Sequence, residues 1–233
     1  MNKKITIAIV CYNAASTIEN AIKSVLNQNY NNYELVIVDG GSKDGTLDII
    51  RTYPSIRFVS EPDKGVYDAM NKALRMADGD YLLFLGADDS LYSDDVLDKV
   101  SGYLIDDYVI YYGNVIKTNK GNVYDGKFSK WKWGYKNICH QSIFYPKSIY
   151  KNKDYELKYK LVADWAYNLL LLAESKSFIY IDMIISHYND VDGISSTQND
   201  KSFLKERKKL VIEAVGILPY YCGLFIKAIN RML

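Results

Sequence analysis

The chain of 233 residues lacks the marks of secreted, disulfide-rich and membrane-spanning proteins. Its three cysteines, Cys11, Cys139 and Cys222, form no CxxC pair, which argues against structural disulfides or a zinc site and for a reducing compartment. No run reaches the roughly 18 uninterrupted apolar residues of a membrane span. The first residues lead directly into a β-branched stretch, which is not typical of a signal peptide. We therefore expect a cytoplasmic protein.

A net charge of one sign and a glycine-rich phosphate loop are also missing. The 29 basic and 28 acidic side chains nearly cancel, so no overall field favours nucleic acid, and anion binding must be local. After the first apolar run, residues 11–16 contain neither the glycines of a GxGxxG motif nor a cation. This argues against a nicotinamide dehydrogenase, and it weakens the case for a nucleotidyltransferase.

What the first hundred residues do contain is a regular alternation of strand-like and helix-like segments. The strand candidates are 5–11, 35–38, 56–59 and 81–85, and helical spacing of apolar residues follows at 18–26, after 46 and at 65–77. We place helix starts at a capping box beginning at Ser16, at Thr46 and near Ser93. The alternation predicts an α/β fold with a mostly parallel central sheet flanked by helices.

Polar residues stand directly after several of these strands. In such sheets ligands bind beyond the carboxyl ends of the strands, so the polar residues should converge on one crevice. They are Tyr12, Asp39, Glu61 with Asp63, and the adjacent pair Asp88-Asp89. Two neighbouring carboxylates at a strand end attract a divalent cation such as Mg²⁺ or Mn²⁺, although one of them could instead cap the following helix.

The second half of the chain is less regular. Its strand candidates are 109–112, 143–145 and 178–185, and a helix is expected from about 163 to 173. We interpret residues 1–202 as one domain with two halves, 1–100 and 101–202. The polar stretch 189–202 is predicted to be a mobile loop.

Four segments, taken together, resemble family 2 glycosyltransferases of the GT-A fold. They are IAIVCYN at 7–13, VDGGSKDGT at 38–46, SEPDKGVYDAMNK at 60–72 and FLGADDS at 84–90. Each is weak alone, but their order and spacing are specific, and the resemblance covers roughly residues 5–195. It implies an inverting transferase that moves a sugar from a nucleotide sugar, with UDP as the nucleotide, to a hydroxyl. In this interpretation 1–100 is the nucleotide-sugar-binding half and 101–202 the acceptor-binding half. The acceptor would be a glycan or a lipid-linked oligosaccharide, as in bacterial surface-polysaccharide assembly.

The resemblance also implies roles for individual residues on the donor side. Tyr12 would pack on the base, Asp39 would accept a hydrogen bond from the base or the ribose, and Asp63 would also lie in the donor site. Asp88 would hold the ribose, and Asp89 would bind Mn²⁺ or Mg²⁺. Because Gly86 stands where the family often has an acid, the division of labour between Asp88 and Asp89 stays open. Asp39 and Asp63 have an alternative interpretation, since either could simply form a turn.

On the acceptor side, the resemblance makes Asp164 the general base, and Trp165 beside it would contact the acceptor or the sugar. Taken by itself, an Asp at the start of an apolar helix is a typical N-cap. His140 and Gln141 would lie where donor sugar and acceptor meet, although a His before a strand often has only a structural role. His187 could complete the shell of the metal.

Residues 203–233 form a separate C-terminal segment in this interpretation. A basic cluster is followed by a break at Pro219 and an aromatic-aliphatic helical stripe, namely Tyr220, Tyr221, Leu224, Phe225, Ala228, Ile229, Met232 and Leu233. Such a helix suits an anionic membrane surface, while packing on the domain or on a second subunit of a homodimer explains it equally well.

A nucleotidyltransferase, or a nucleotide-sugar-binding module without turnover, remains the alternative function.

Overall fold

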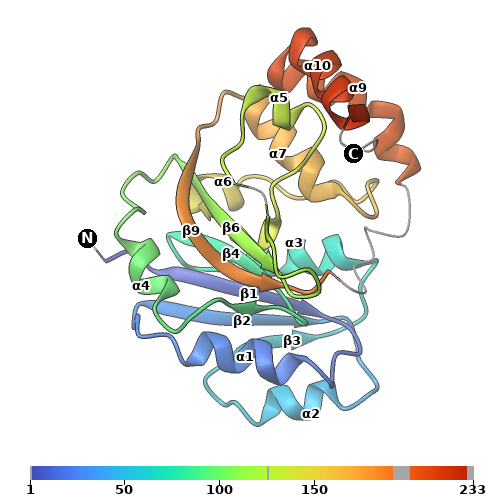
Figure 1. Cartoon of the computed structure of the whole chain (residues 1–233). Coiled ribbons are helices and arrows are strands. Elements are labelled where there is room, and N and C mark those ends of the chain that lie inside the picture. Colours follow the sequence, from blue (N-terminus) through green and yellow to red (C-terminus); the bar gives the residue numbers. More distant parts are fainter. Residues whose placement is uncertain (1, 125, 191–199, 230–233) are drawn as a thin grey trace.

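The protein is described here by a computed structural model covering residues 2–124, 126–190 and 200–229. One curled sheet forms its centre, with helices on both faces (Figure 1). The strands are β1 (Ile5–Cys11), β2 (Tyr33–Asp39), β3 (Arg57–Ser60), β4 (Tyr81–Gly86), β5 (Ser90–Leu91), β6 (Ile110–Lys117), β7 (Val123–Tyr124), β8 (Ile143–Pro146) and β9 (Phe178–Tyr188). The helices are α1 (Ile18–Leu26), α2 (Thr46–Arg51), α3 (Val66–Met76), α4 (Val96–Ser101), α5 (Lys130–Trp133), α6 (Lys147–Tyr150), α7 (Ala163–Ala173), α9 (Lys201–Val215) and α10 (Ile217–Ile229), with a 3₁₀ turn η1 (His140–Ser142).

The order of the strands explains where the sheet is parallel. Neighbours follow β3-β2-β1-β4-β8-β6-β9-β5, with β7 on β6. The four strands β3, β2, β1 and β4 are all parallel, as the alternating sequence predicts. β8 then runs antiparallel between β4 and β6, and β9 is parallel to β6, so the second half makes the sheet mixed. The predicted α/β architecture is confirmed, with parallel order concentrated in the first half.

The core has two layers, one on each face of the sheet. In β1 the side chains of Ile5, Ile7 and Ile9 belong to the layer under α1, α2 and α4, whereas Ala8 belongs to the layer under α3 and α7. Alternate residues of a strand point to opposite faces, so a run that is apolar throughout is one buried on both sides. Because β1, β2 and β4 are also parallel, their carboxyl ends lie together at one edge of the sheet.

The predicted side-chain caps of the first helices are wrong. Thr17 is the N-cap of α1 and makes no capping hydrogen bond, so the capping box at Ser16 does not form. Thr46 is the first residue of α2 after Gly45, and its hydroxyl donates to Asp44. α4 begins only after Asp95, which accepts a hydrogen bond from Ser93. Thr46 and Ser93 hydrogen-bond to nearby aspartates, so these short side chains stabilise local turns instead of capping the helices.

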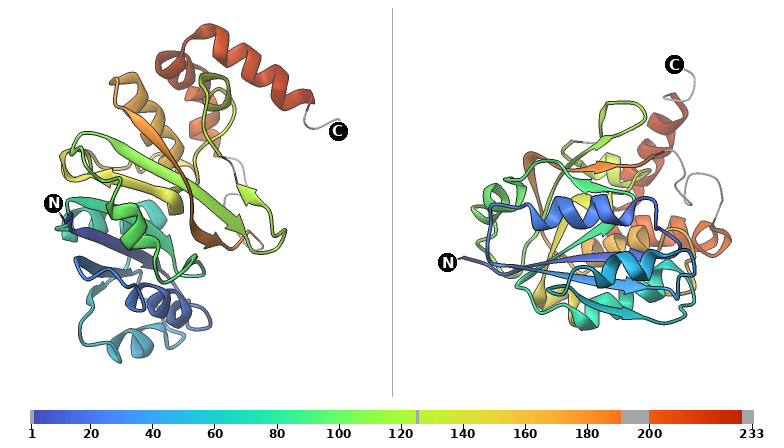
Figure 2. Two further views of the ribbon diagram at one scale, coloured as in Figure 1. Left: turned by 60° about the vertical axis from the view of Figure 1, so that its left-hand side comes forward. Right: turned by 90° about the horizontal axis from the view of Figure 1, so that it is seen from below.

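The C-terminal helices also differ from prediction. The break falls at Gly216, whose φ of 95° is in the left-handed region, while Pro219 lies within the first turn of α10, where proline is tolerated. The predicted boundary at 202 lies inside α9, whose buried side chains, Phe203, Leu210 and Val211, belong to the same core layer as α7. α10 lies at the far end of the molecule from α1 and α2 (Figure 2). Most of the predicted loop, 191–199, and the stripe residues Met232 and Leu233 lie outside the described residues.

Candidate active site

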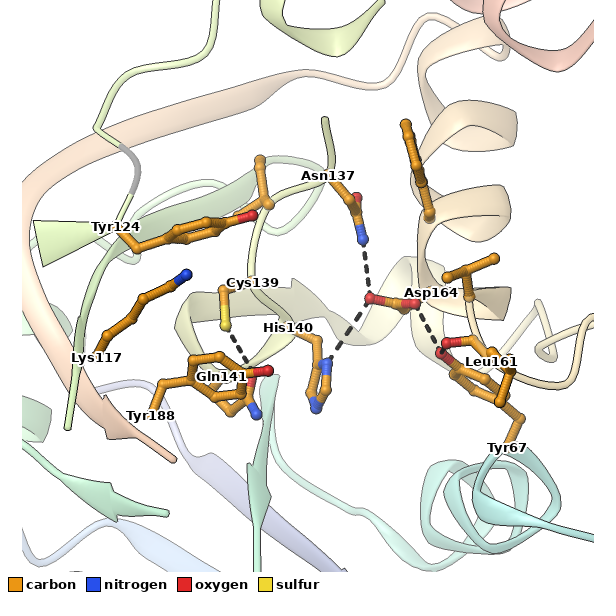
Figure 3. A pocket seen from close by; sticks show the side chains of 13 residues that line it. Tyr67, Lys117, Tyr124, Asn137, Cys139, His140, Gln141, Leu161, Asp164 and Tyr188 are labelled. Carbon is orange, nitrogen blue, oxygen red and sulfur yellow. Dashed lines mark hydrogen bonds and ion pairs between the residues drawn. The ribbon is translucent and has the colours of Figure 1, made fainter. Parts of the chain in front are cut away.

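A pocket of about 210 Å³ opens beside the start of α7, next to η1 and the ends of β6 and β9 (Figure 3). Polar and aromatic side chains from distant parts of the chain line it: Tyr67, Lys117, Tyr124, Asn137, Ile138, Cys139, His140, Gln141, Leu161, Val162, Asp164, Trp165 and Tyr188. The lining therefore includes the predicted general base, Asp164, and the three residues predicted beside it, His140, Gln141 and Trp165.

Asp164 is the second residue of α7, and Val162 rather than Asp164 is the N-cap. Its Oδ1 accepts a hydrogen bond from Tyr67 Oη at 2.7 Å, and its Oδ2 accepts one from Asn137 Nδ2 at 2.8 Å. The alternative that Asp164 caps its helix is therefore wrong. Burial, and then the Asp164 carboxylate, raise the pKa of Tyr67 well above its ordinary value, so the phenol remains a hydrogen-bond donor.

A chain of hydrogen bonds that leads into the core holds Asn137 in place. Its Oδ1 accepts from Asn168 Nδ2 at 3.0 Å, and Asn168 Oδ1 in turn accepts from Tyr145 Oη at 2.7 Å. Since its oxygen is occupied in this way, the Asn137 amide presents its N–H to Asp164. The orientation of the Asp164 carboxylate is thus set by side chains from α3, α7 and the segment before η1.

The η1 turn connects Asp164 to the acidic pair. His140 Nδ1 lies 3.7 Å from Asp164 Oδ2, and the next residue, Gln141, donates from Nε2 to Asp89 Oδ2 at 2.7 Å. Gln141 is buried and lines the pocket, while its side-chain amide is held by Asp89. His140 is only half-buried, and its ring points toward Asp164 (Figure 3).

Asp88 and Asp89 have opposite environments although they are adjacent. Asp89 is 2% exposed and also accepts hydrogen bonds from the backbone N–H groups of Gly86 and Asn189. Burial is the main cause that raises the pKa of Asp89 to about 6, and the charge of Asp88 adds to it. Asp88 is exposed, and one of its oxygens accepts from Asn189 Nδ2 at 3.1 Å.

Asp88 could bind a divalent cation only if a substrate, through its phosphates, supplied further ligands. Among the residues that the structure describes, no three His, Cys, Asp or Glu side chains form a metal-binding group. Mg²⁺ is often held by one or two carboxylates plus substrate phosphates, so an exposed Asp88 at a strand end meets this requirement. His187 lies in β9 opposite Ser90, and its ring packs 5.1 Å from that of Tyr92.

A second cluster of polar side chains lies where β1 and β2 end. Gly40 packs closely against Asp63 and Tyr12, because a Cβ atom added at Gly40 would lie 2.5 Å from Asp63 Oδ2 and 3.3 Å from a ring carbon of Tyr12. The ring of Tyr12 is 63% exposed and available for stacking. Glu61 instead forms an ion pair with Lys72 on α3. The structure thus brings together Tyr12 and Asp63, two of the four predicted donor residues.

Asp39 is buried directly beneath this group. Its oxygens accept from the backbone N–H groups of Gly41 and Ser42 and from the hydroxyls of Ser42 and Ser60. Burial opposes ionisation, but these donors together lower the pKa of Asp39, so the carboxylate is charged and shapes the turn after β2. The turn that was an alternative to donor binding is present, and a contact with a base or ribose stays a prediction.

Trp165 joins the pocket to α9. Its ring packs 5.0 Å from that of Phe203, and the guanidinium of Arg207 lies 5.2 Å above it. Because Trp165 lines the pocket on one side and packs on α9 on the other, α9 supports the pocket wall. Its predicted contact with the acceptor stays a prediction.

The sequence analysis did not select Tyr67, Asn137, Asn189 or Lys117. Asn137 lies in a segment without helix or strand and Lys117 at the end of β6, and neither belongs to a sequence pattern. Tyr67 stands within the segment 60–72 that carries the resemblance, but no role was assigned to it there. Only the fold shows that it is buried in α3 and that its hydroxyl reaches Asp164.

The curled α/β sheet and the acidic sites at its carboxyl edge define the GT-A class of nucleotide-sugar transferases. The family model "Glycosyl transferase family 2" matches residues 6–176, most of the chain, which therefore belongs to this family and is a glycosyltransferase. The predicted family and enzyme class are confirmed.

Two curated relatives illustrate the similarity in sequence. A PGL/p-HBAD biosynthesis glycosyltransferase of Mycobacterium tuberculosis is 37% identical over 210 residues, which are 86% of this chain and 82% of the relative. The UDP-Glc:alpha-D-GlcNAc-diphosphoundecaprenol beta-1,3-glucosyltransferase WfaP of Escherichia coli is 27% identical over 98% of this chain and 94% of its own length.

Solved structures confirm the fold. TarS of S. aureus in complex with UDP-GlcNAc superposes with a TM-score of 0.73 at 17% identity, covering 90% of this chain and 66% of that one. The mannosyltransferase PcManGT of Pyrobaculum calidifontis in complex with GDP-Man and Mn²⁺ has a TM-score of 0.68 at 19% identity, covering 99% of this chain and 65% of that one. At such identities the likeness concerns the fold alone.

Proposed function

We propose that this glycosyltransferase inverts configuration as it moves a sugar from a UDP-linked donor to a hydroxyl of a glycan or lipid-linked acceptor. The observation that carries the proposal is the Asp164 carboxylate, which lies in the wall of the pocket and is oriented by Tyr67 and Asn137. A carboxylate held in this way suits a general base, because proton transfer depends first on geometry.

The reaction we propose is a single displacement. The acceptor oxygen forms a bond to the anomeric carbon while its proton passes to Asp164, and the bond to the nucleoside diphosphate breaks on the opposite face. One displacement inverts configuration, so an α-linked donor gives a β-linked product. Tyr67 and Asn137 hold the carboxylate still, and His140 beside it would contact the acceptor or the transferred sugar.

The exposed ring of Tyr12, with Asp63 beside it, would bind the base of the donor. A divalent cation, Mn²⁺ or Mg²⁺, would offset charge on the leaving diphosphate. Asp88 is exposed, whereas Asp89 is buried and accepts hydrogen bonds from Gly86, Gln141 and Asn189, which favours Asp88 as the ligand and Asp89 as the residue that positions Asn189. This reverses the division of roles expected from the resemblance, and His187 stays a candidate for the metal shell.

The names of the relatives support a role in surface glycan assembly. WfaP acts on a diphosphoundecaprenol-linked sugar with a UDP-linked donor, and the TarS structure contains UDP-GlcNAc. We propose a donor of the same nucleotide and an acceptor of the lipid-linked class for this chain.

We further propose that the enzyme works at the inner face of the cell membrane through α10. Apolar side chains of this helix are exposed, with Tyr221 at 51% and Phe225 at 68%. Lys208 of α9 lies over the Tyr221 ring, so a cation flanks the apolar face, a pattern that suits anionic lipid. In the described part of the chain no helix combines the length and apolar character needed to cross a bilayer.

A donor screen tests the proposed function. Nucleotide sugars are added one by one with and without Mn²⁺, and both the melting temperature and the release of nucleoside diphosphate in the presence of candidate acceptors are measured. A bound donor at 100 times its Kd adds ~2.7 kcal/mol of stability. Stabilisation with release, and NMR showing inverted anomeric configuration in the product, supports the proposal. Stabilisation without release supports the alternative of a binding module, and release of pyrophosphate from a nucleoside triphosphate supports a nucleotidyltransferase.

A further inference from the structure

One ammonium group faces the pocket from the side opposite Asp164. Lys117 is the last residue of β6, whereas Asp164 stands on α7, and the η1 turn lies between them (Figure 3). Among the described residues that line the pocket, Lys117 is the sole lysine or arginine. The pocket therefore has an acidic end and a basic end.

The partners of Lys117 are aromatic rather than acidic. Its Nζ lies 4.6 Å from the centre of the Tyr124 ring, and Lys136 Nζ lies 4.2 Å from the centre of the same ring. No carboxylate of the described residues forms an ion pair with Lys117. A half-buried ammonium on a ring face is only partly compensated, so this end of the pocket is complementary to an anion.

The size and lining of the pocket indicate which substrate brings that anion. About 210 Å³ is below the roughly 300–1,000 Å³ of drug-sized ligand sites, so it suits a single sugar unit. None of the predicted donor residues, Tyr12, Asp39, Asp63 and Asp88, lines it. An anion next to Lys117 therefore belongs to the molecule that presents its hydroxyl to Asp164.

We propose that Lys117 binds a phosphate group of the acceptor, so that the enzyme selects a sugar phosphate or sugar diphosphate rather than a neutral glycan end. Lysine binds phosphate as a point charge, while Tyr124 limits where the ammonium can lie. This rests on the proposed glycosyl transfer and names its acceptor class. Across the pocket, Asp164 takes the proton of a hydroxyl on the same sugar.

The test compares matched pairs of ligands in the presence of UDP and Mn²⁺. Glucose, galactose and N-acetylglucosamine 1-phosphates are each titrated against the methyl glycoside of the same sugar, using wild type, Lys117→Met and Lys120→Met. Lys120 is an exposed lysine three residues further along the same hairpin and serves as the control. We expect at least one phosphate to bind wild type roughly 10- to 100-fold more tightly than its glycoside. Lys117→Met should abolish that preference, and Lys120→Met should keep it.

Three results would overturn the proposal. The first is that no sugar phosphate is preferred over its glycoside, or that the preference survives in Lys117→Met. The second is that Lys117→Met weakens UDP instead, which assigns the anion to the donor. The third is that methyl glucuronoside is preferred over every phosphate, which assigns a carboxylate. A wild-type protein that binds sugar phosphates but neither binds nor turns over any nucleotide sugar would instead contradict the proposed glycosyl transfer.

Discussion

Asn137 Nδ2 lies 2.8 Å from Asp164 Oδ2, and this contact joins a loop before η1 to the first turn of α7. Tyr67 on α3 holds the other oxygen at 2.7 Å. Three segments of the chain, none adjacent in sequence, therefore fix one carboxylate. Such partners orient the Asp164 carboxylate, as a functional side chain requires, whereas a helix cap needs no partners outside its own helix.

Replacing Asp164 by Asn should stop turnover without unfolding the protein. Asn keeps the size of the side chain but accepts no proton from the acceptor, so we expect a loss of roughly 10² to 10⁴ in kcat. One hydrogen bond of the carboxylate is also lost, at about 0.5–1.5 kcal/mol of stability. Steady-state kinetics, donor titration and melting curves measure the three effects. Asp154→Asn, on the exposed surface, is the control, and a fully active Asp164→Asn would remove Asp164 from the mechanism.

Tyr67→Phe should affect kcat while leaving donor affinity unchanged. The variant keeps the aromatic contact with Tyr155 but removes the hydroxyl that fixes Asp164. A hydrogen bond to a charged group of this kind corresponds to roughly a tenfold loss in kcat. Tyr53→Phe, which removes an exposed hydroxyl bound to Glu19, should have wild-type kinetics. An unchanged kcat in Tyr67→Phe would mean that Asn137 alone orients the carboxylate.

Asp88→Asn should remove the contribution of the divalent cation to donor binding. The exposed carboxylate is the one that can reach a cation shared with a diphosphate, so donor affinity with Mn²⁺ should fall to the level found in excess chelator. Calorimetric titration of UDP with and without Mn²⁺ measures the difference, and Asp98→Asn on α4 is the matched control. If Asp88→Asn keeps its response to Mn²⁺, the cation lies elsewhere, with Asp89 as the next candidate.

Phe225→Ser should weaken attachment to membranes without reducing catalysis on a soluble acceptor. The ring is exposed on α10 and makes little contribution to the core, so the fold should persist. Co-sedimentation with vesicles containing phosphatidylglycerol measures binding, which should also fall with added salt because surface charges are screened. Wild type that ignores such vesicles but sediments as a dimer, with Phe225→Ser monomeric, would assign the face to a second subunit.

Glu34→Gln should remove part of the acid sensitivity of the fold. Burial raises the pKa of Glu34, but hydrogen bonds from Thr6, Lys4 and the backbone of Asp78 outweigh it and bring the pKa to about 2, from 4.5. A lowered pKa stabilises the folded state above about pH 4.5, and that stability is lost as pH falls toward 2.

At pH 7 the Glu34→Gln variant should therefore be less stable by ~1–3 kcal/mol, and its stability should change less between pH 5 and 3. Urea denaturation at several pH values measures both. Glu213→Gln, at a long and exposed pair with Lys209, is the control, and equal pH profiles for the two variants would contradict the assignment.

The strands and long helices were predictable because burial leaves a direct record in the sequence. The run Ile5–Cys11 is apolar on both faces of the sheet, and Ala163–Ala173 is predicted and found as one helix. The start of α2 at Thr46 was predicted correctly, but the capping roles of Ser16 and Thr46 were not predictable, because short polar side chains form turns and caps with nearly equal ease.

By itself, the sequence determined the family, the parallel first half of the sheet and the acidic residues that end its strands, since each depends on local order along the chain. The tertiary structure alone decided what those residues do. Asp88 and Asp89 are indistinguishable in sequence. In the structure, Asp89 is buried and accepts hydrogen bonds from Gln141 and Asn189, whereas Asp88 is exposed. The partners of Asp164 come from positions 27 and 97 residues away, and such long-range contacts follow only from how the sheet curls and how α3 and α7 pack on it.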